Sequence, residues 1–298
     1  MASRSQPART AGLLLLLTPL IWGGTFPAAK VALEHLSPWT FMAWSRGLGL
    51  AALVPILALW RPRGDAWRPS VWAAGLGLGV LMNLGYALQT VGIAHTTATD
   101  AGFITVLYVV FAPLGAAVLG RRLPSPVTAL CVAMSFAGLA LLSLHGAHLQ
   151  AGDVLVLGSA VAFACHILLI DRLLERFDAI ALATAQTAGS ALVALAVAVP
   201  DGAHTGRVAS LWGIFLLTGV LGSGVAFAIQ VVGQTTVSPA RAAVMLPAEA
   251  LVSALTAAVR LGERLSTRAW LGVALMLSAI AVSETHAWRQ SSRAKAVL

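Results

Sequence analysis

This chain repeats a segment of its own sequence at long range. Ala-Leu-Gln-Thr-Val-Gly at 87–92 returns as Ala-Ile-Gln-Val-Val-Gly at 228–233, with four of the six positions identical. Each copy continues through an apolar, helix-length stretch, which ends in Leu-Gly-Arg-Arg-Leu at 119–123 and in Leu-Gly-Glu-Arg-Leu at 261–265. A period near 141 residues in a chain of 298 residues indicates two copies of one large unit, because solenoid repeats are only about 20–50 residues long.

The composition places this unit in a membrane. Apolar residues make up 58% of the chain, charged residues only 10%, and the mean hydropathy is +0.86. A soluble domain carries about 25% charged residues, so most of this surface faces something other than water. A membrane-spanning helix needs about 20 apolar residues, and the runs lack the period-2 alternation of strands. We therefore predict an all-α integral membrane protein with ten transmembrane helices, over 11–32, 39–60, 70–92, 98–119, 125–143, 152–171, 179–199, 210–233, 239–261 and 267–285.

Ten spans and one duplication give two five-helix repeats, which we place at 11–144 and 152–285. Because five is odd, the second repeat must enter the membrane from the opposite side, and inverted repeats are typical of secondary transporters. With the residues 1–10 and 286–298 as cytoplasmic tails, thirteen of the nineteen Lys and Arg residues lie on the cytoplasmic side, five lie outside, and Arg46 lies within a span. This bias favours a multi-pass protein of the cytoplasmic membrane with both termini in the cytoplasm.

Several other function classes fit the sequence poorly. The net charge of +8 could suggest nucleic acid, but the basic residues are scattered singly between apolar runs and form no stripe. Gly75, Gly77 and Gly79 lack the spacing and the strand-to-helix context of a phosphate loop, so Gly75 with Gly79 and the cluster at 219–224 are interpreted as close helix packing. No Walker loop is present, and no cofactor, bound metal or catalytic residue is expected. An integral-membrane enzyme and a receptor-like protein that binds a small ligand remain the alternatives to a transporter.

Three motifs resemble one known family. These are Trp-Gly-Gly-Thr-Phe at 22–26, Arg46 in the second span, and the Leu-Gly-Arg/Glu-Arg-Leu run that closes the fourth span of each repeat. They resemble the EamA branch of the drug/metabolite transporter superfamily, over nearly the whole chain. The chain departs from the family pattern at Arg121, where Glu is usual, and at Ala250, where Pro usually follows the Glu. The resemblance implies a ten-helix carrier that exports or exchanges small metabolites, such as amino acids, or toxic organic compounds, although some relatives work in uptake.

Charged residues inside spans need a reason, since each costs about 2.5–3.5 kcal/mol at a helix centre on insertion scales. Arg46 either faces the cavity and pairs with a substrate carboxylate, or pairs structurally with Glu34 or Asp100. Glu249 either faces the cavity, where it binds cations or takes up a proton, or is held by Arg241 or another helix. Asp100 begins a helix, where a carboxylate favours the positive end of the helix dipole, so capping is its expected role.

Uncharged polar and aromatic side chains at membrane depth complete the candidate site. Three of them recur at intervals of three residues on the third span, two occupy the matching region of the eighth, and the fourth and sixth spans add one each. A mixed lining of this kind suits a small organic ligand, whereas the alternative is hydrogen bonding between helices. With Arg46 and Glu249, the predicted substrate-binding residues are Asn83, Tyr86, Gln89, Tyr108, His166, Phe227 and Gln230. The predicted function is secondary transport of a small organic metabolite by alternating access, in the export direction, with possible coupling to protons.

Overall fold

The fold is known from a computed structural model, which describes residues 14–59, 66–120, 125–143, 150–202, 204–235, 237, 245–246, 248–262 and 266–296. Within these ranges every regular element is a helix. Residues 1–10, Arg121, Arg241 and the motif positions 121–123 and 263–265 lie outside the described residues.

Six helices form the first half of the chain: α2 (Leu17–Leu33), α3 (Pro38–Leu59), α4 (Pro69–Ala94), α5 (Ala98–Thr105), α6 (Tyr108–Gly120) and α7 (Pro126–Ser143). Local signals set several of their ends. Pro69 fits the first turn of α4, where its missing N–H group costs nothing. Thr97, not Asp100, is the N-cap of α5: its hydroxyl accepts the Asp100 amide at 2.9 Å and donates to the Asp100 carboxylate at 2.8 Å. Asp100 lies in the first turn, as expected, where its carboxylate favours the helix dipole.

The second half contains α8 (Ala151–Leu174), α9 (Ala179–Ala198), α10 (Thr205–Ser210), α11 (Trp212–Phe215), the π-helix η2 (Leu216–Val225), α12 (Ala226–Gln234), α14 (Ala248–Leu261) and α15 (Thr267–Ala296), with the 3₁₀ turn η1 (Val199–Asp201) after α9. At the start of α8, Asp153 accepts the backbone N–H of Gln150, which completes a capping box. Asp178 caps α9 through the amides of Ile180 and Ala181.

Five helical segments are long and apolar enough to span a membrane: Pro38–Leu59, Pro69–Ala94, Ala151–Leu174, Ala179–Asp201 and Trp212–Gln234. The other five of the ten expected spans rest on the sequence alone. One predicted span is not continuous, because 98–119 divides into α5 and α6 at Val106 and Leu107. Three consecutive β-branched residues at 104–106 favour this break, since branching at Cβ lowers helix propensity. The last helix also continues to Ala296, beyond its predicted end at 285.

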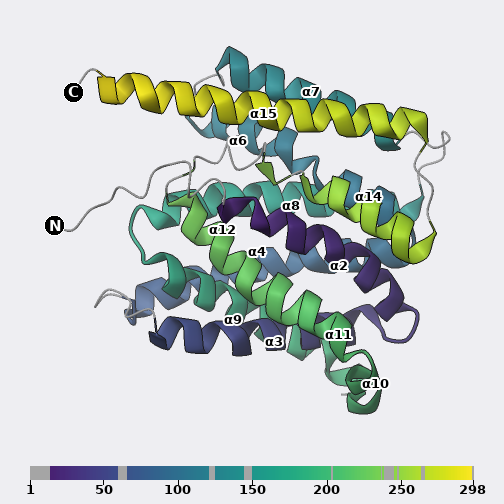
Figure 1. Ribbon diagram of the computed structural model, residues 1–298. Coiled ribbons are helices and arrows are strands. Elements are labelled where there is room, and N and C mark those ends of the chain that lie inside the picture. The colour runs from purple at the N-terminus through teal and green to yellow at the C-terminus, as the bar shows by residue number, and fades with distance from the viewer. Residues whose placement is uncertain are drawn as a thin grey trace.

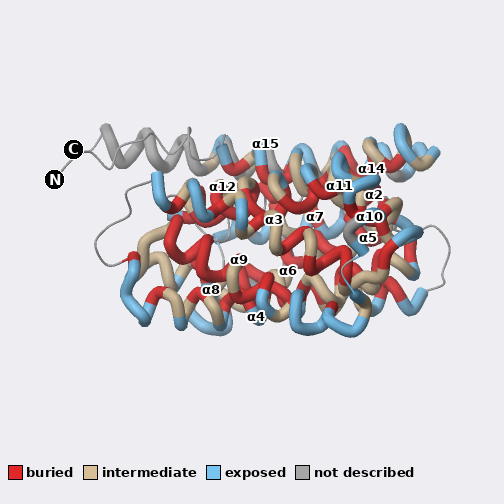
Figure 2. The backbone as a smooth tube through the Cα atoms, turned by 90° about the horizontal axis from the view of Figure 1, so that it is seen from below, coloured by how far each residue is buried: buried red, intermediate tan, exposed pale blue. Residues whose placement is uncertain are grey.

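The helices pack in a pattern that exchanges between the halves. The third helix of the first half, α4, lies along α9 and α8, and its counterpart in the second half, η2 with α12, lies along α3 and α2. In the same way α2 packs on α14, and its counterpart α8 packs on α6. Three further pairs each join a helix to its own counterpart in the other half: α3 with α9, α5 with α14, and α7 with α15. Figure 1 shows α7 and α15 side by side at one edge of the bundle. Buried positions follow the inward faces of the helices in Figure 2, and exposed positions lie at the rim.

Glycines permit the closest of these helix contacts. An ideal Cβ on Gly75 or Gly79 would collide with α9, and one on Gly224 would lie 3.0 Å from the carbonyl oxygen of Gly49 on α3. Gly77 has nothing within 4 Å of such an atom. The interpretation of these segments as close packing is therefore confirmed for Gly75 and Gly79 and for the cluster at 219–224.

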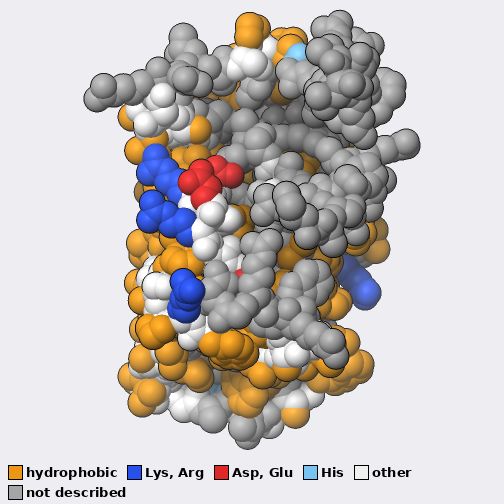
Figure 3. Space-filling model, turned by 90° about the vertical axis from the view of Figure 1, so that its left-hand side faces the viewer, with side chains coloured by type: hydrophobic (Ala, Val, Ile, Leu, Met, Phe, Trp, Pro, Cys, Tyr) orange, Lys and Arg blue, Asp and Glu red, His pale blue; other side chains and the backbone are white. Residues whose placement is uncertain are grey.

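The two ends of the bundle differ in their polar contacts. At the end where α4 stops, the Lys30 ammonium donates to the carbonyl oxygens of Ile93 at 2.8 Å and Thr96 at 2.7 Å. These bonds satisfy acceptors that the last turn of a helix leaves free. Figure 3 looks onto the opposite end, where α8 stops and α9 begins. Side chains of both charges gather there among hydrophobic ones.

Candidate functional site

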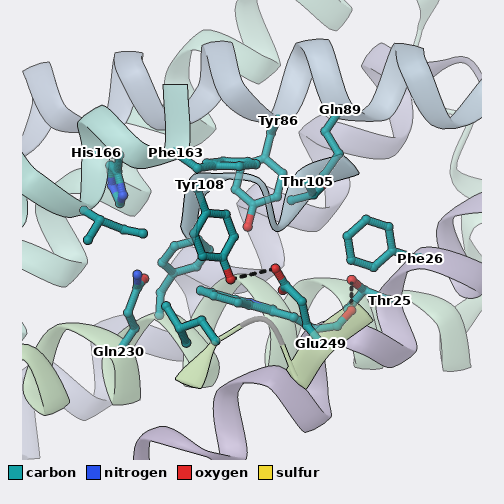
Figure 4. A pocket seen from close by; sticks show the side chains of 14 residues that line it. Thr25, Phe26, Tyr86, Gln89, Thr105, Tyr108, Phe163, His166, Gln230 and Glu249 are labelled. Atoms are coloured by element: carbon teal, nitrogen blue, oxygen red, sulfur yellow. Dashed lines mark hydrogen bonds between the residues drawn. The ribbon is translucent and has the colours of Figure 1, made fainter. Parts of the chain in front are cut away.

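A cavity lies inside the bundle, between helices of both halves. The first half contributes walls from α2, α4, α5 and α6, and the second half contributes α8, α12, α14 and Leu246. The cavity has a volume of about 40 Å³. That is room for a few water molecules. The lining side chains are Trp22, Thr25, Phe26, Tyr86, Gln89, Thr105, Tyr108, Phe163, His166, Ile167, Phe227, Gln230, Leu246 and Glu249 (Figure 4).

Glu249 is the carboxylate of the cavity. It lies in the first turn of α14, where the helix dipole favours a negative charge, and only 3% of it is exposed. The Tyr108 hydroxyl donates to its Oε1 at 2.9 Å across the cavity (Figure 4). No cation among the described residues forms an ion pair with it, and the alternative partner Arg241 lies outside them. The side chain is therefore buried, with one hydroxyl as its side-chain partner in the described part of the chain.

Arg46 lies beside the cavity and does not line it. Its guanidinium carbon is 3.8 Å from the centroid of the Tyr86 ring, so that ring separates it from the cavity. The side chain is buried, and its Nε and Nη1 atoms have no hydrogen-bond partner. The guanidinium therefore stacks on Tyr86 and does not pair with Glu34 or Asp100.

Aromatic rings form a connected wall. Trp22 and Phe227 have centroids 5.0 Å apart, Tyr86 lies 5.0 Å from Phe163 and 5.9 Å from Phe227, and the two Tyr86 contacts are edge-to-face. His166 meets Phe227 in the same way at 6.3 Å. Such tilted pairs stabilise packing beyond the area they bury. The wall gives the cavity an aromatic, largely apolar surface with a few polar groups around it.

The predicted amides separate into two groups. Gln89 and Gln230 line the cavity, and the Gln89 amide nitrogen donates to the Thr105 hydroxyl at 3.0 Å. Asn83 does not line it, because its Oδ1 accepts the Ser190 hydroxyl of α9 at 3.2 Å. Asn83 therefore fits the alternative stated above, in which buried amides form hydrogen bonds between helices. His166 does line the cavity, and its Nε2 lies 3.0 Å from Gln186 Oε1.

Sequence reasoning missed several lining residues. Trp22, Thr25 and Phe26 occupy positions i, i+3 and i+4 of α2, so the motif at 22–26 carries a helical face that could have indicated them. The Trp22 indole also donates to the Gly222 carbonyl of η2 at 3.0 Å. Phe163 has no comparable signal, since one phenylalanine in an apolar helix is indistinguishable from a lipid-facing one.

Known proteins resemble the whole chain. A relative from Archaeoglobus fulgidus, named an uncharacterized transporter, is 29% identical over 272 residues, which is 91% of this chain and 85% of the relative. The uncharacterized transporter YwfM of Bacillus subtilis is 28% identical over 287 residues, 91% of this chain and 92% of that protein. A solved crystal structure superposes with a TM-score of 0.74 at 18% identity, covering 94% of this chain and 99% of that one, so the fold is shared.

The sequence model of the EamA-like transporter family matches the chain twice, at residues 9–144 and 150–285. Together with the apolar helices, the two matches indicate a multi-pass membrane protein with a transporter's architecture. The resemblance inferred from the motifs is thereby confirmed: the chain belongs to the EamA-like transporter family.

Proposed function

We propose that this protein is a secondary transporter that carries a small organic metabolite, an amino acid or a related compound, or a toxic organic molecule, across the cytoplasmic membrane. It works by alternating access and in the export direction, with both termini in the cytoplasm and the two halves inverted relative to each other. The observation that carries the proposal is the buried cavity whose walls come from both halves. Inverted-repeat carriers place their substrate at this kind of seam.

The exchange of helix contacts between the halves supports the inverted arrangement. The main contacts between the halves occur in matched pairs: α4 packs on α9 and α8 as η2 packs on α3 and α2, and α2 packs on α14 as α8 packs on α6. Motion that opens one side of such a structure closes the other. The cavity in this conformation admits only a few water molecules, so a metabolite requires the helices around it to separate.

The chemistry of the walls supports an organic substrate with a cationic group. Glu249 provides a buried carboxylate, and the adjacent aromatic wall provides stacking and cation–π contacts. An ammonium group beside Glu249 would replace its missing cation, and the apolar part of the molecule would lie on Phe227 and Tyr86. Arg46, behind Tyr86, has two nitrogen atoms, Nε and Nη1, available to donate to a carboxylate once that ring moves.

Glu249 is also the group suited to carry a proton. Its only described side-chain partner is the Tyr108 hydroxyl, which can donate to the carboxylate or accept from the protonated acid. We propose that proton and substrate occupy this carboxylate alternately, which couples transport to the proton gradient.

The test is solute flux in proteoliposomes, with a panel of amino acids, organic cations and nucleosides. Flux that depends on the protein supports a transporter. Binding without flux for every compound would favour a receptor-like protein instead. We expect Glu249→Gln to abolish the pH dependence of flux, while Glu175→Gln, on an exposed residue at the end of α8, leaves it unchanged. A Glu249→Gln protein with the wild-type pH profile would limit this residue to a structural role.

Substrate contact by the two lining amides is tested in the same assay. Gln89→Ala and Gln230→Ala should each weaken substrate binding several-fold, because each removes a hydrogen-bonding group from the cavity wall. Asn83→Ala is the matched control, since this amide lies on the same helix as Gln89 but bonds to α9. Normal affinity in both Gln variants would remove them from the site.

A further inference from the structure

Three buried glutamines at one end of the cavity have hydrogen-bonding capacity that no group among the described residues uses. They are Gln186 on α9 and Gln230 and Gln234 on α12, with exposed fractions of 0%, 2% and 4%. The Nε2 of Gln186 and the Oε1 atoms of the other two have no partner. Burying a polar atom without a hydrogen-bond partner is costly, so three such atoms together in one region call for a ligand.

The three amides gather around one turn of α8. Gln186 bonds to His166 at 3.0 Å, and the Gln234 amide nitrogen donates to the carbonyl of Ile167 at 3.4 Å. Gln230 precedes Gln234 by four residues on α12, so both lie on the same face of that helix. His166, Ile167 and Gln230 all line the cavity, so each amide either lines it or bonds to a residue that does.

The orientation of the amide groups does not remove the vacancies. If the oxygen and nitrogen of the Gln186 amide were exchanged, the nitrogen would face His166 and the oxygen would be the atom without a partner. In Gln234 the exchange would bring an amide oxygen against the Ile167 carbonyl, which is repulsive, so its nitrogen must be the donor. In the orientation shown, the cluster offers a free donor on Gln186 and free acceptors on Gln230 and Gln234, and with Gln186 exchanged all three free atoms would be acceptors.

We propose that Gln186, Gln230 and Gln234, together with His166, form a polar compartment continuous with the cavity that binds uncharged groups able to donate and accept hydrogen bonds. Carboxamides are neutral, and the compartment therefore favours water, a hydroxyl or a carboxamide over a carboxylate or an ammonium. In the empty carrier water fills it. In the loaded carrier, and this part rests on the proposed function, the hydroxyl or carboxamide of the substrate replaces that water while the charged end lies toward Glu249.

The first experiment tests for water and needs no substrate. Cys131 and Cys165, both free thiols, are replaced by Ala, and single cysteines are introduced by Gln186→Cys, Gln234→Cys and, as a control, Leu192→Cys. Leu192 lies on α9 like Gln186, but 61% of it is exposed on the apolar outer surface. The reconstituted proteins are treated with a small charged methanethiosulfonate from either side of the membrane.

Because this reaction requires a thiolate, and so requires water, we expect modification of the two Gln-derived cysteines to be at least about tenfold faster than that of the control. Variants that elute as monodisperse protein in size-exclusion chromatography are compared. Rates no faster than that of the lipid-facing control would overturn the compartment.

The second experiment identifies the occupant in the loaded carrier. Affinities for L-glutamine and L-norleucine, amino acids of similar size with and without a carboxamide, are measured for the wild type and for Gln186→Met and Gln234→Met. We expect the wild type to prefer L-glutamine at least about fivefold, the equivalent of one hydrogen bond, and both variants to lose the preference while still binding L-norleucine.

The outcomes of the two experiments distinguish water from a group of the substrate as the occupant of the compartment. A lost preference supports occupation by the substrate's own group, whereas fast thiol modification with an unchanged preference supports a compartment filled by water alone. If neither amino acid binds, the amino-acid proposal fails, and the thiol experiment still decides whether the compartment exists.

Discussion

Gly79 of α4 lies where two helices of different halves touch through their backbones. An ideal Cβ at this position would lie 2.8 Å from the Ser190 nitrogen and 2.9 Å from the Gly189 Cα, and it would collide with the Gln186 carbonyl oxygen. Gly77, two residues earlier on the same helix, has nothing within 4 Å of its ideal Cβ. Gly79→Ala and Gly77→Ala are thus the same chemical change made in a closed and in an open environment.

The geometry gives the size of the difference. Ordinary contact begins at 3.4 Å, so a methyl group at Gly79 must push α9 away by about half an ångström or more, and backbone atoms cannot rotate aside as a side chain can. Overpacking of this kind costs about 1–3 kcal/mol. Gly→Ala in a helix interior contributes about 1 kcal/mol of stabilisation through helix propensity. Gly77→Ala receives that gain alone, so Gly79→Ala should be less stable than Gly77→Ala by about 1–3 kcal/mol.

Both variants would be purified in the same detergent, heated in steps, and assayed for the fraction that still elutes as monodisperse protein. At about 2–4 °C per kcal/mol, the midpoint of Gly79→Ala should lie roughly 2–12 °C below that of Gly77→Ala. Equal midpoints, or a higher midpoint for Gly79→Ala, would refute the close approach of α4 and α9 on which the seam between the halves depends.

Three further substitutions test single interactions. Lys30→Met should lower the thermal midpoint, because it leaves carbonyls at the end of α4 without their donor, at a cost of about 1–3 kcal/mol; an unchanged midpoint would contradict this capping role. Trp22→Phe keeps a ring in the wall but removes the donor to the Gly222 carbonyl, so amide hydrogen exchange in η2 should accelerate about fivefold. Unchanged exchange would show that this hydrogen bond does not stabilise the π-helix. Arg46→Met should raise the midpoint and weaken substrate binding, since it removes a buried charge with two nitrogen atoms that lack a partner among the described residues. A lowered midpoint would mean that the stack on Tyr86 outweighs the cost of burying the guanidinium.

The sequence indicated the class of fold and most of the polar cavity wall, because both follow from the positions of rare residues in apolar runs. Its error at Asn83 follows from helix geometry. Residues three apart on a helix fall about 60° short of a full turn, so Asn83 and Gln89 differ by about 120°. With Tyr86 between them facing the cavity, Gln89 also reaches it while Asn83 faces Ser190 on α9.

The π-helix could not be predicted from local sequence. Among its ten residues, Gly219 and Gly224 allow a close approach of α3 and Gly222 allows one of α2, but none of them specifies an i→i+5 hydrogen-bond register. That register is supported by tertiary contacts, including the Trp22 indole on the Gly222 carbonyl and the packing of Gly224 on Gly49. The surroundings of Arg46 could not be predicted from local sequence either. The sequence places a charge at membrane depth but cannot show that a tyrosine ring lies between it and the cavity.

The contacts around the cavity differ in stiffness, and the difference indicates where it opens. α4 meets α9, and α3 meets η2, through backbone atoms at glycines, and Gly23 of α2 meets the backbone of α14 at the Glu249 carbonyl. Across the α6–α8 wall, by contrast, Gly115 faces only the terminal Cδ1 of Leu168, which a rotamer change can move. This same wall contains the break between α5 and α6, directly before Tyr108. Separation of helices costs least where side chains alone are in contact, so we expect α6 to move away from the cavity first. Because Glu249 stays with the tightly packed α2–α14 pair, that movement breaks its hydrogen bond to Tyr108 and leaves the carboxylate free for a cation or a proton.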